Sequence, residues 1–308
     1  MLISKVPNLF QTGRDVLKIK FLAIAALSVL SFNCLFAQEE TNKSFTISLF
    51  TGLMNYQGDL NPTSFRFAHS NFNGGIIVRK PLSSLFTIRA GVNIGTIKAH
   101  DKWNSDYLKI RNLSFTSTVK EAYAALELTV PNLANERFTP YLYVGIAIFN
   151  FNPWTYDNSG AKIYLKPLST EGQGLTQYPT KKPYNLTQLA IPYGAGMKFA
   201  ISDGLALGVE FNHRKTFTDY LDDVSSNFVD RDVLLQARGA KAVELSYRGD
   251  ELPNGSPLFP TQGDQRGTPT RKDWYYFFGV TMEFKLRNID LLFRNNKPVA
   301  NQRCPTRF

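Results

Sequence analysis

The most constraining feature of this chain is the spacing of its apolar and polar residues after about residue 40. Eight segments of about a dozen residues each have strand character, and several alternate strictly between apolar and polar or small residues. The connections between them alternate in length: long, short, long, short, long, short, long. This pattern is typical of a small outer-membrane β-barrel, with long loops outside the cell and tight turns in the periplasm. The expected strands are 45–56, 72–80, 85–97, 115–130, 139–152, 187–200, 205–215 and 273–286.

The segment 205–215 shows how the two faces of each strand differ. Leu207 and Val209 lie on an apolar face, whereas Glu210 and Arg214 lie on the opposite face, which also carries the small residues Ala206 and Gly208. A soluble barrel of the lipocalin kind would turn the apolar face inward. Here the opposite face carries charges of both signs beside glycines, which favours a polar lumen and a lipid-facing exterior. The residues expected to form this lumen charge network are Arg89, Glu121, Glu127, Glu210, Arg214 and Glu283.

Eight strands enclose only enough space for side chains, so no open pore is expected. The fold class predicted is therefore all-β: an eight-stranded antiparallel transmembrane β-barrel with long extracellular loops. One of its short turns is expected at Ser202-Asp203-Gly204, where Asp-Gly would supply the positive φ that hairpin turns need. A soluble barrel or sandwich is the alternative, and the loop lengths disfavour it.

The two ends of the chain differ from this strand pattern. Residues 1–37 have a basic beginning and an apolar run, as in a secretory signal that is removed on export. Residues 38–286 would form the barrel in the outer membrane. An even number of strands places both barrel ends in the periplasm, so residues 287–308 would be a basic periplasmic tail. This tail is a candidate docking segment for a partner, and its residues of interest are Arg294, Lys297, Arg303 and Cys304.

The formal net charge of +10 does not indicate nucleic-acid binding. Four basic residues and one acid lie in the expected signal, which leaves the mature chain near +7, and much of that excess lies in the tail. No recognition helix or zinc motif is present, and export to the envelope argues against a nucleic-acid partner. With the signal removed, Cys304 would be the only cysteine, either a free thiol or an intermolecular bridge.

The sequence offers few candidates for catalysis or metal binding. His213 lies near the outer end of a strand, where a lipid hydrolase would need its base, but no spacing to Ser225 or Ser226 amounts to a triad. An interfacial histidine is the simpler interpretation. An acidic stretch that includes Asp219, Asp222 and Asp223 does not match a calcium-binding loop, and shaping of the loop by hydrogen bonds to backbone amides is the simpler role. We therefore expect no catalytic residue, no metal and no cofactor, and we identify no small-molecule substrate.

Several segments resemble a known family of outer-membrane barrels. The most specific is Phe217–Ser225, FTDYLDDVS, followed by Phe228-Val229-Asp230. Asn55–Leu60, NYQGDL, is a second marker, and Arg266-Gly267 and Arg303-Cys304-Pro305 agree. Together they look like the PorG-like barrels of the type IX secretion system. The family-motif loop residues are Asp219, Tyr220, Asp222 and Asp223.

This resemblance implies a non-enzymatic outer-membrane component of a protein secretion machine. Its expected partners are periplasmic ring proteins of the PorK and PorN kind, together with outer-membrane lipids. The family pattern gives no catalytic residues. Two other functions remain open: a surface adhesin or ligand-binding barrel that acts through loops 153–184 and 216–271, and a lipid-modifying enzyme.

Overall fold

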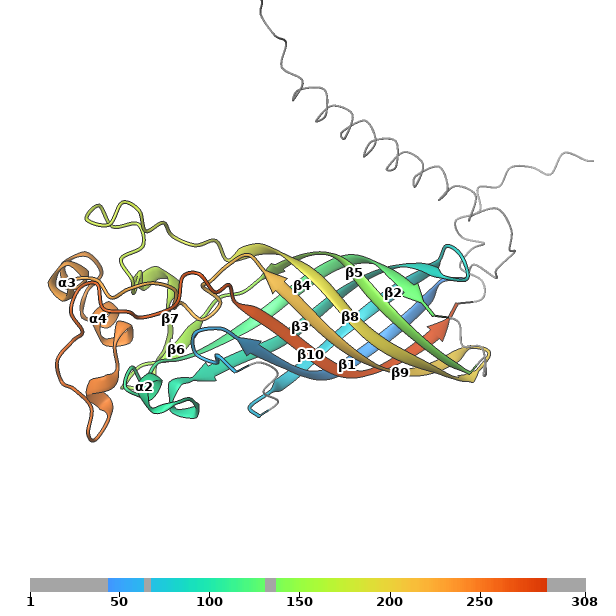
Figure 1. Ribbon diagram of the computed structural model, residues 1–308, viewed down its shortest axis with the longest axis horizontal. Helices are drawn as coiled ribbons and strands as arrows, with labels where there is room; N and C mark the ends of the chain where they lie inside the picture. The colour runs from blue at the N-terminus through green and yellow to red at the C-terminus, as the bar shows by residue number, and fades with distance from the viewer. Residues whose placement is uncertain (1–43, 64–67, 131–136, 287–308) are drawn as a thin grey trace, which may run out of the picture. The chain divides into compact units, whose positions relative to one another are not determined.

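The computed structural model describes residues 44–63, 68–130 and 137–286. Within these ranges eight antiparallel strands form a closed barrel (Figure 1). They are β1 (Thr46–Gln57), β2 (Asn71–Pro81), β3 (Phe86–His100), β4 (Ser114–Thr129), β5 (Phe138–Asn150), β8 (Thr187–Ser202), β9 (Leu205–Thr216) and β10 (Trp274–Lys285). The neighbour order is β3-β2-β1-β10-β9-β8-β5-β4, and the pairing of β3 with β4 closes the ring.

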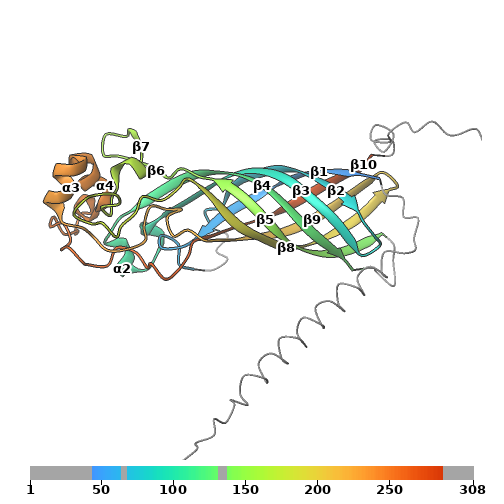
Figure 2. The same cartoon turned by 90° about the horizontal axis from the view of Figure 1, so that it is seen from above.

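The connections at the two ends of the barrel differ in what they contain. At the end that we call the turn end, residues 82–85 and 203–204 are short turns. At the opposite, loop end, the chain forms a small hairpin of β6 (Trp154–Tyr156) and β7 (Lys162–Tyr164) and the helices α2 (Asp106–Lys109), α3 (Arg231–Arg238) and α4 (Ala240–Ser246). Figure 2 shows these elements at the loop end, where three short 3-10 helices also lie: Asp101–Trp103, Lys166–Leu168 and Gly249–Glu251.

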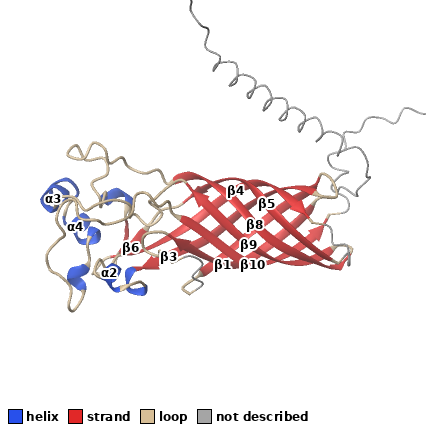
Figure 3. Ribbon diagram, viewed as in Figure 1, coloured by secondary structure: helices blue, strands red, loops and turns tan. Residues whose placement is uncertain are grey.

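The β3–β4 hairpin extends beyond its neighbours at the loop end. Its ladder runs from Phe86↔Leu128 to His100↔Ser114. The flanking ladders stop earlier, at Gly95 on the β2 side and at Lys120 on the β5 side. The projecting part is continued by β6, which pairs with Thr116 of β4. Figure 3 shows this extension of strand structure past the rest of the wall.

The apolar face of every barrel strand points outward. One outward side chain from each strand, with its exposure, illustrates the band: Leu49 50%, Ile76 47%, Val92 56%, Leu126 44%, Ile146 73%, Met197 41%, Val209 43% and Val280 52%. Charged and aromatic polar side chains fill the inside instead. An apolar exterior around a closed ladder leaves no backbone group unpaired in hydrocarbon, so this is a transmembrane barrel of the outer-membrane type. The soluble alternative, with its apolar face inward, is wrong.

The strand predictions from sequence are confirmed, with boundaries that differ by up to three residues. The segments 1–37 and 287–308, expected to be a signal and a tail, lie outside the described residues. None of the helices in the described ranges has both the length and the apolar character of a membrane span.

Two local expectations need correction. The β8–β9 turn occurs where it was predicted, but Gly204 does not have a positive φ. The pairing of β8 with β9 is irregular between Ala200 and Ser202, next to the turn. The chain therefore reverses there without a glycine at positive φ. The segment 216–271, expected as a loop, contains the helices α3 and α4. Asp230 begins α3 by accepting hydrogen bonds from the amides of Asp232 and Val233.

Candidate functional site: the lumen network and the loop cap

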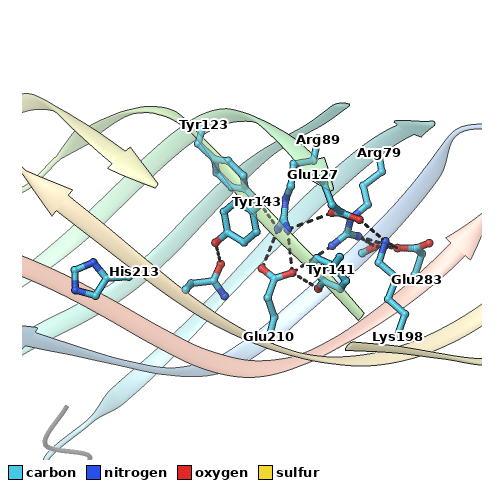
Figure 4. Close-up of polar contacts among 12 residues, drawn as sticks. Arg79, Arg89, Tyr123, Glu127, Tyr141, Tyr143, Lys198, Glu210, His213 and Glu283 are labelled. Atoms are coloured by element: carbon cyan, nitrogen blue, oxygen red, sulfur yellow. Dashed lines mark hydrogen bonds and ion pairs between the residues drawn. The ribbon is translucent and has the colours of Figure 1, made fainter. Parts of the chain in front are cut away.

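The lumen near the turn end is filled by a buried network of charged side chains (Figure 4). Its cations are Arg79, Arg89 and Lys198, and its anions are Glu127, Glu210 and Glu283. Three cations therefore face three anions. The side chains of Arg79, Arg89, Glu127 and Glu210 are at most 1% exposed. A network this deeply buried is stable only if its charges balance and its donors are paired.

Glu210 holds the centre of this network. Its Oε1 lies 2.8 Å from Arg89 Nη2, and its Oε2 lies 3.3 Å from Arg79 Nη2. Tyr141 donates its hydroxyl hydrogen to Glu210 Oε2 at 2.5 Å. Because Glu210 comes from β9 and the arginines come from β2 and β3, these contacts cross the lumen rather than follow one ladder. They fix opposite walls of the barrel to each other.

Glu127 connects Arg79 to Lys198, the network's less buried cation. Arg79 Nε donates to Glu127 Oε2 at 3.0 Å, and Lys198 Nζ donates to Glu127 Oε1 at 2.7 Å. Glu283 accepts from Arg79 at 2.9 Å and lies 3.4 Å from Lys198. The anions are therefore each shared by two or more cations, which satisfies most of their lone pairs.

A second layer lies closer to the loop end. Arg214 forms a bidentate pair with Glu121, at 2.7 Å and 2.8 Å. Tyr275 donates to the same carboxylate at 2.6 Å. Tyr143 donates to Arg214's neighbour on the same face, Asn212. A small void of about 10 Å³ lies beside Glu210.

The structure thus brings the sequence-predicted lumen residues together in two groups, Arg89, Glu127, Glu210 and Glu283 in one and Glu121 and Arg214 in the other. Sequence reasoning missed Arg79 and Lys198. Arg79 was obscured because Ile76, Ile77 and Val78 form an apolar run that hides the alternation of β2. The short turn between β2 and β3 could have revealed Arg79. Antiparallel pairing across that turn places Arg79 opposite Arg89.

The family-motif loop does not extend into solvent. We define the loop cap as residues 151–186 and 217–273, which contact the loop end of the barrel. Leu221 and Val224 are buried in the main apolar cluster, together with Tyr56, Phe149 and Tyr184. The motif loop therefore contributes to the interior of the protein at the mouth of the barrel.

Asp222 joins the loop cap to the first strand. It accepts a hydrogen bond from the Tyr56 hydroxyl at 2.5 Å and from the amide of Leu60 at 3.2 Å. Tyr56 also lies 3.2 Å from Asp273 Oδ1, and Asp273 Oδ2 accepts from the amide of Leu221 at 2.8 Å. Two buried carboxylates thus share one tyrosine at the seam between β1 and β10.

A second centre in the loop cap is built around Arg266 and Glu171. Arg266 Nη1 lies 2.9 Å from Glu171 Oε1 and donates to the carbonyl of Asp223 at 2.7 Å. Glu171 also accepts from the amides of Ser225 and Ser226, at 2.9 Å and 3.1 Å. The carboxylate of Asp223 accepts from Thr170 and Tyr184, so the 151–186 and 217–273 segments are held together.

Burial changes the acidity of the cap carboxyls. Desolvation raises the pKa of Asp219 to about 7 and that of Asp223 to about 6. The pKa values of Asp222 and Asp273 are raised well above the usual range, first by desolvation and then by neighbouring carboxylates. Removal of a carboxylate from water disfavours its charged form, and a nearby like charge adds to that effect.

The structure also places the residues considered for catalysis and metal binding. His213 lies on the outward register of β9, where its ring stacks on Tyr193 at 4.8 Å and meets Trp274 edge-on at 4.5 Å. Figure 4 shows it apart from the lumen network. Ser225 instead donates to Asp219 at 2.7 Å. Across the described ranges, no group of three His, Cys, Asp or Glu side chains is arranged to hold a metal ion.

The four tail residues proposed for docking, Arg294, Lys297, Arg303 and Cys304, lie outside the described residues. The remaining motif residue, Tyr220, stacks on Tyr184 at 4.8 Å within the loop cap. Burial raises the pKa of Tyr220 to about 12. The tyrosine therefore stays protonated as a hydrogen-bond donor.

Comparison with solved structures finds other small outer-membrane proteins. Neisserial surface protein A (NspA) is 7% identical, with 81% of this chain and 100% of that chain covered and a TM-score of 0.39. Ail of Yersinia pestis, in complex with the heparin analogue sucrose octasulfate, is 9% identical, with 79% and 100% covered and a TM-score of 0.36. OprG of Pseudomonas aeruginosa is 8% identical, with 79% and 98% covered and a TM-score of 0.33.

The sequence comparisons place the chain in a family without an assigned activity. No curated protein matches it. A family model matches residues 24–234, which is more than half of the chain and includes seven of the barrel strands and much of the loop cap. The chain therefore belongs to the family described as a domain of unknown function, DUF6089.

Proposed function

We propose that this outer-membrane barrel is a non-enzymatic component of the type IX protein secretion machinery, which acts through its surfaces. The observation that carries the proposal is the filled lumen. Arg79, Arg89 and Glu210 occupy the interior with almost no exposure, and the loop cap lies at one mouth. A barrel whose interior is occupied by a balanced ion network does not conduct a protein, so its part in export is one of support and assembly.

The resemblance to PorG-like barrels supports the same proposal. Its most specific segment, residues 217–225, supplies buried contacts at the barrel mouth through Asp222 and Leu221. Such a segment maintains the loop cap, and its sequence is restricted by packing. A shared motif with this structural role is consistent with a shared barrel-and-cap architecture in a common machine.

The proposed partners are periplasmic ring proteins of the PorK and PorN kind. The surfaces available to them are the turn end, with residues 82–85 and 203–204, and the tail after Leu286. The basic side chains Arg294, Lys297 and Arg303, with Cys304, give this tail the chemistry to bind an acidic protein surface. In this proposal the ring binds at the turn end of the barrel.

The experiment is affinity purification of the full protein from detergent-solubilised outer membranes, with mass spectrometry of the partners. Recovery of a periplasmic ring lipoprotein and its companion is expected. A truncation after Leu286 should insert normally, lose that recovery and reduce export of many unrelated cargoes. Full export by an inserted truncated barrel would contradict docking by the tail, and recovery of the intact barrel alone would contradict the secretion role.

A surface-binding barrel is the second candidate, and one observation favours it. The loop cap is an ordered structure held by buried ion pairs such as Arg266–Glu171, rather than a set of separate loops. An ordered cap can present a fixed surface to an external ligand. Deletion of the gene separates the two functions, because loss of export of many cargoes is expected only for a secretion component.

A further inference from the structure

A cavity of about 730 Å³ lies between the loop cap and the loop end of the barrel wall. It is formed by the end of β1, the β9–β10 pair and residues 265–272, and its volume is in the range of small-molecule binding sites. The lumen network and the family-motif loop do not line it. The cavity is separate from the surfaces assigned to secretion partners.

Three exposed cations line the cavity, and the charge of one of them, Lys272, also acts on the carboxyl group of Asp219. Lys215, Arg271 and Lys272 line it and are exposed, and none of them forms an ion pair with any described residue. Two further arginines line the cavity and are already paired with carboxylates: Arg111 with Asp101 and Arg266 with Glu171. The acidic residue of the lining, Asp59, already accepts a hydrogen bond from the amide of Thr268 at 2.9 Å. The free positive charge therefore favours an anionic ligand.

The remaining lining has the chemistry of a sugar site. Thr268 and Thr270 bring hydroxyl groups to the cavity, of the kind that bind sugar hydroxyls, and Trp274 provides a flat aromatic surface. The amide nitrogen of Gln265 donates to the Gly267 carbonyl at 3.1 Å, which leaves its side-chain oxygen as an acceptor. Phosphate groups are recognised by lysine and arginine side chains. Together these groups match a sugar that carries phosphate better than they match an apolar ligand or a bare inorganic ion.

The position of the cavity indicates where such a ligand would come from. Lys215 and Trp274 are opposite each other in the β9–β10 ladder, and both lie on the outward register. The Trp274 ring contacts His213, which stacks on Tyr193, so these three rings form part of an outward aromatic belt. Aromatic belts lie at the level of the lipid head groups. The cavity thus adjoins the membrane surface at the loop end.

From these observations we propose that the cavity binds the phosphorylated sugar head group of a glycolipid in the adjoining leaflet. Lys215, Arg271 and Lys272 bind the phosphate, Trp274 packs against the sugar ring, and Thr268 and Thr270 bind its hydroxyls. The acyl chains remain in the bilayer against the apolar wall of β9 and β10. The bound lipid would connect the loop cap to the membrane surface.

The test uses the full mature protein in phosphatidylcholine nanodiscs that contain bisphosphorylated lipid A, dephosphorylated lipid A or neither. Retained lipid is measured by native mass spectrometry, and soluble glucosamine 6-phosphate serves as the free-ligand probe. The triple variant Lys215→Gln, Arg271→Gln, Lys272→Gln is compared with a control that neutralises three exposed cations outside the cavity: Lys102→Gln, Lys182→Gln, Arg238→Gln. Heat-modifiable migration on gels verifies that each barrel is folded.

We expect the triple variant to bind bisphosphorylated lipid A roughly a hundredfold more weakly, since each cation near an anionic lipid surface contributes about fivefold. The control should change little, and Trp274→Phe should weaken binding without a change in charge. Equal binding by the triple variant and its control would overturn the proposal. Equal retention of dephosphorylated lipid would overturn the phosphate assignment, and equally tight binding of glucosamine 6-phosphate would overturn the lipid source.

Discussion

Replacement of Glu210 by glutamine would test whether charge balance in the lumen stabilises the barrel. The change keeps the size of the side chain and removes one negative charge. Glu210 accepts from Arg89 at 2.8 Å and from Tyr141 at 2.5 Å, and it lies 3.3 Å from Arg79. After the change, three cations of the network would face two anions, and the new amide group would point its donors toward arginines.

The expected loss can be estimated from the remaining contacts. Arg79 keeps Glu127 at 3.0 Å and Glu283 at 2.9 Å, but Arg89 keeps only Glu127 at 3.4 Å. Removal of one partner from a buried pair typically costs about 3–5 kcal/mol, because a charge is left uncompensated. We expect Glu210→Gln to lower the free energy of unfolding by about that amount.

The assay is reversible urea unfolding of the barrel in lipid vesicles, followed by tryptophan fluorescence and by migration on gels. The double variant Arg89→Met, Glu210→Gln restores equal numbers of cations and anions. It should therefore be more stable than Glu210→Gln alone, with a coupling energy of about 1–3 kcal/mol. Asp232→Asn is the surface control. It removes the exposed pair with Arg231, 3.0 Å apart, and should cost less than about 1 kcal/mol.

Two results would refute this reasoning. If Glu210→Gln were no more costly than Asp232→Asn, the network would not depend on its charge balance. If the effects of Arg89→Met and Glu210→Gln were simply additive, the two side chains would stabilise the barrel independently, despite their direct contact.

Three further predictions concern the loop cap and the barrel seam. Burial raises the pKa of Asp219 to about 7, so the contribution of Asp219 to cap stability should be fully present below the ordinary carboxyl range and should be lost as pH rises through about 7; hydrogen exchange of residues 217–273 should show this loss, and Asp219→Asn should reduce it. Arg266→Met should leave Glu171 buried and unpaired and should expose the cap to protease while the barrel stays folded on gels. Gly52→Ala should prevent closure of the β1–β10 seam, since a Cβ there would lie 2.7 Å from Gly279 Cα and would also meet the Phe278 carbonyl, whereas Gly204→Ala, with open space around it, should fold normally; membrane insertion assays compare the two.

The barrel could be predicted from sequence because its determinants are local. Each strand carries its own alternation, as in 205–215. Successive side chains point alternately inward and outward, so the direction of one side chain fixes the direction of the others in its strand. The same rule fails where a strand has two apolar residues in succession. In β2, Ile77 points inward and is only 4% exposed, so Arg79 did not stand out as a member of the lumen network.

The loop cap could not be predicted because its contacts join distant segments. Tyr56 and Asp222 are 166 residues apart, and Glu171 and Arg266 are 95 apart. No periodic pattern within a loop reports such a pairing. Two local signals were present: the helix cap at Asp230 and the acids of the motif loop. Both indicate local hydrogen bonds to the backbone, and neither identifies a partner in a distant segment.

The hydrogen bonds of Tyr56 have a consequence for the order in which the protein assembles. Tyr56 lies at the end of β1, and its partner Asp273 immediately precedes β10, 217 residues later. These two groups come together only when the first and last strands of the barrel meet. Contacts between such distant parts of a chain form slowly, because a long loop must close first. We therefore expect sequential assembly: the contact between Tyr56 and Asp273 forms only after strand closure, and a slow final phase in protection of this part of the cap should follow insertion.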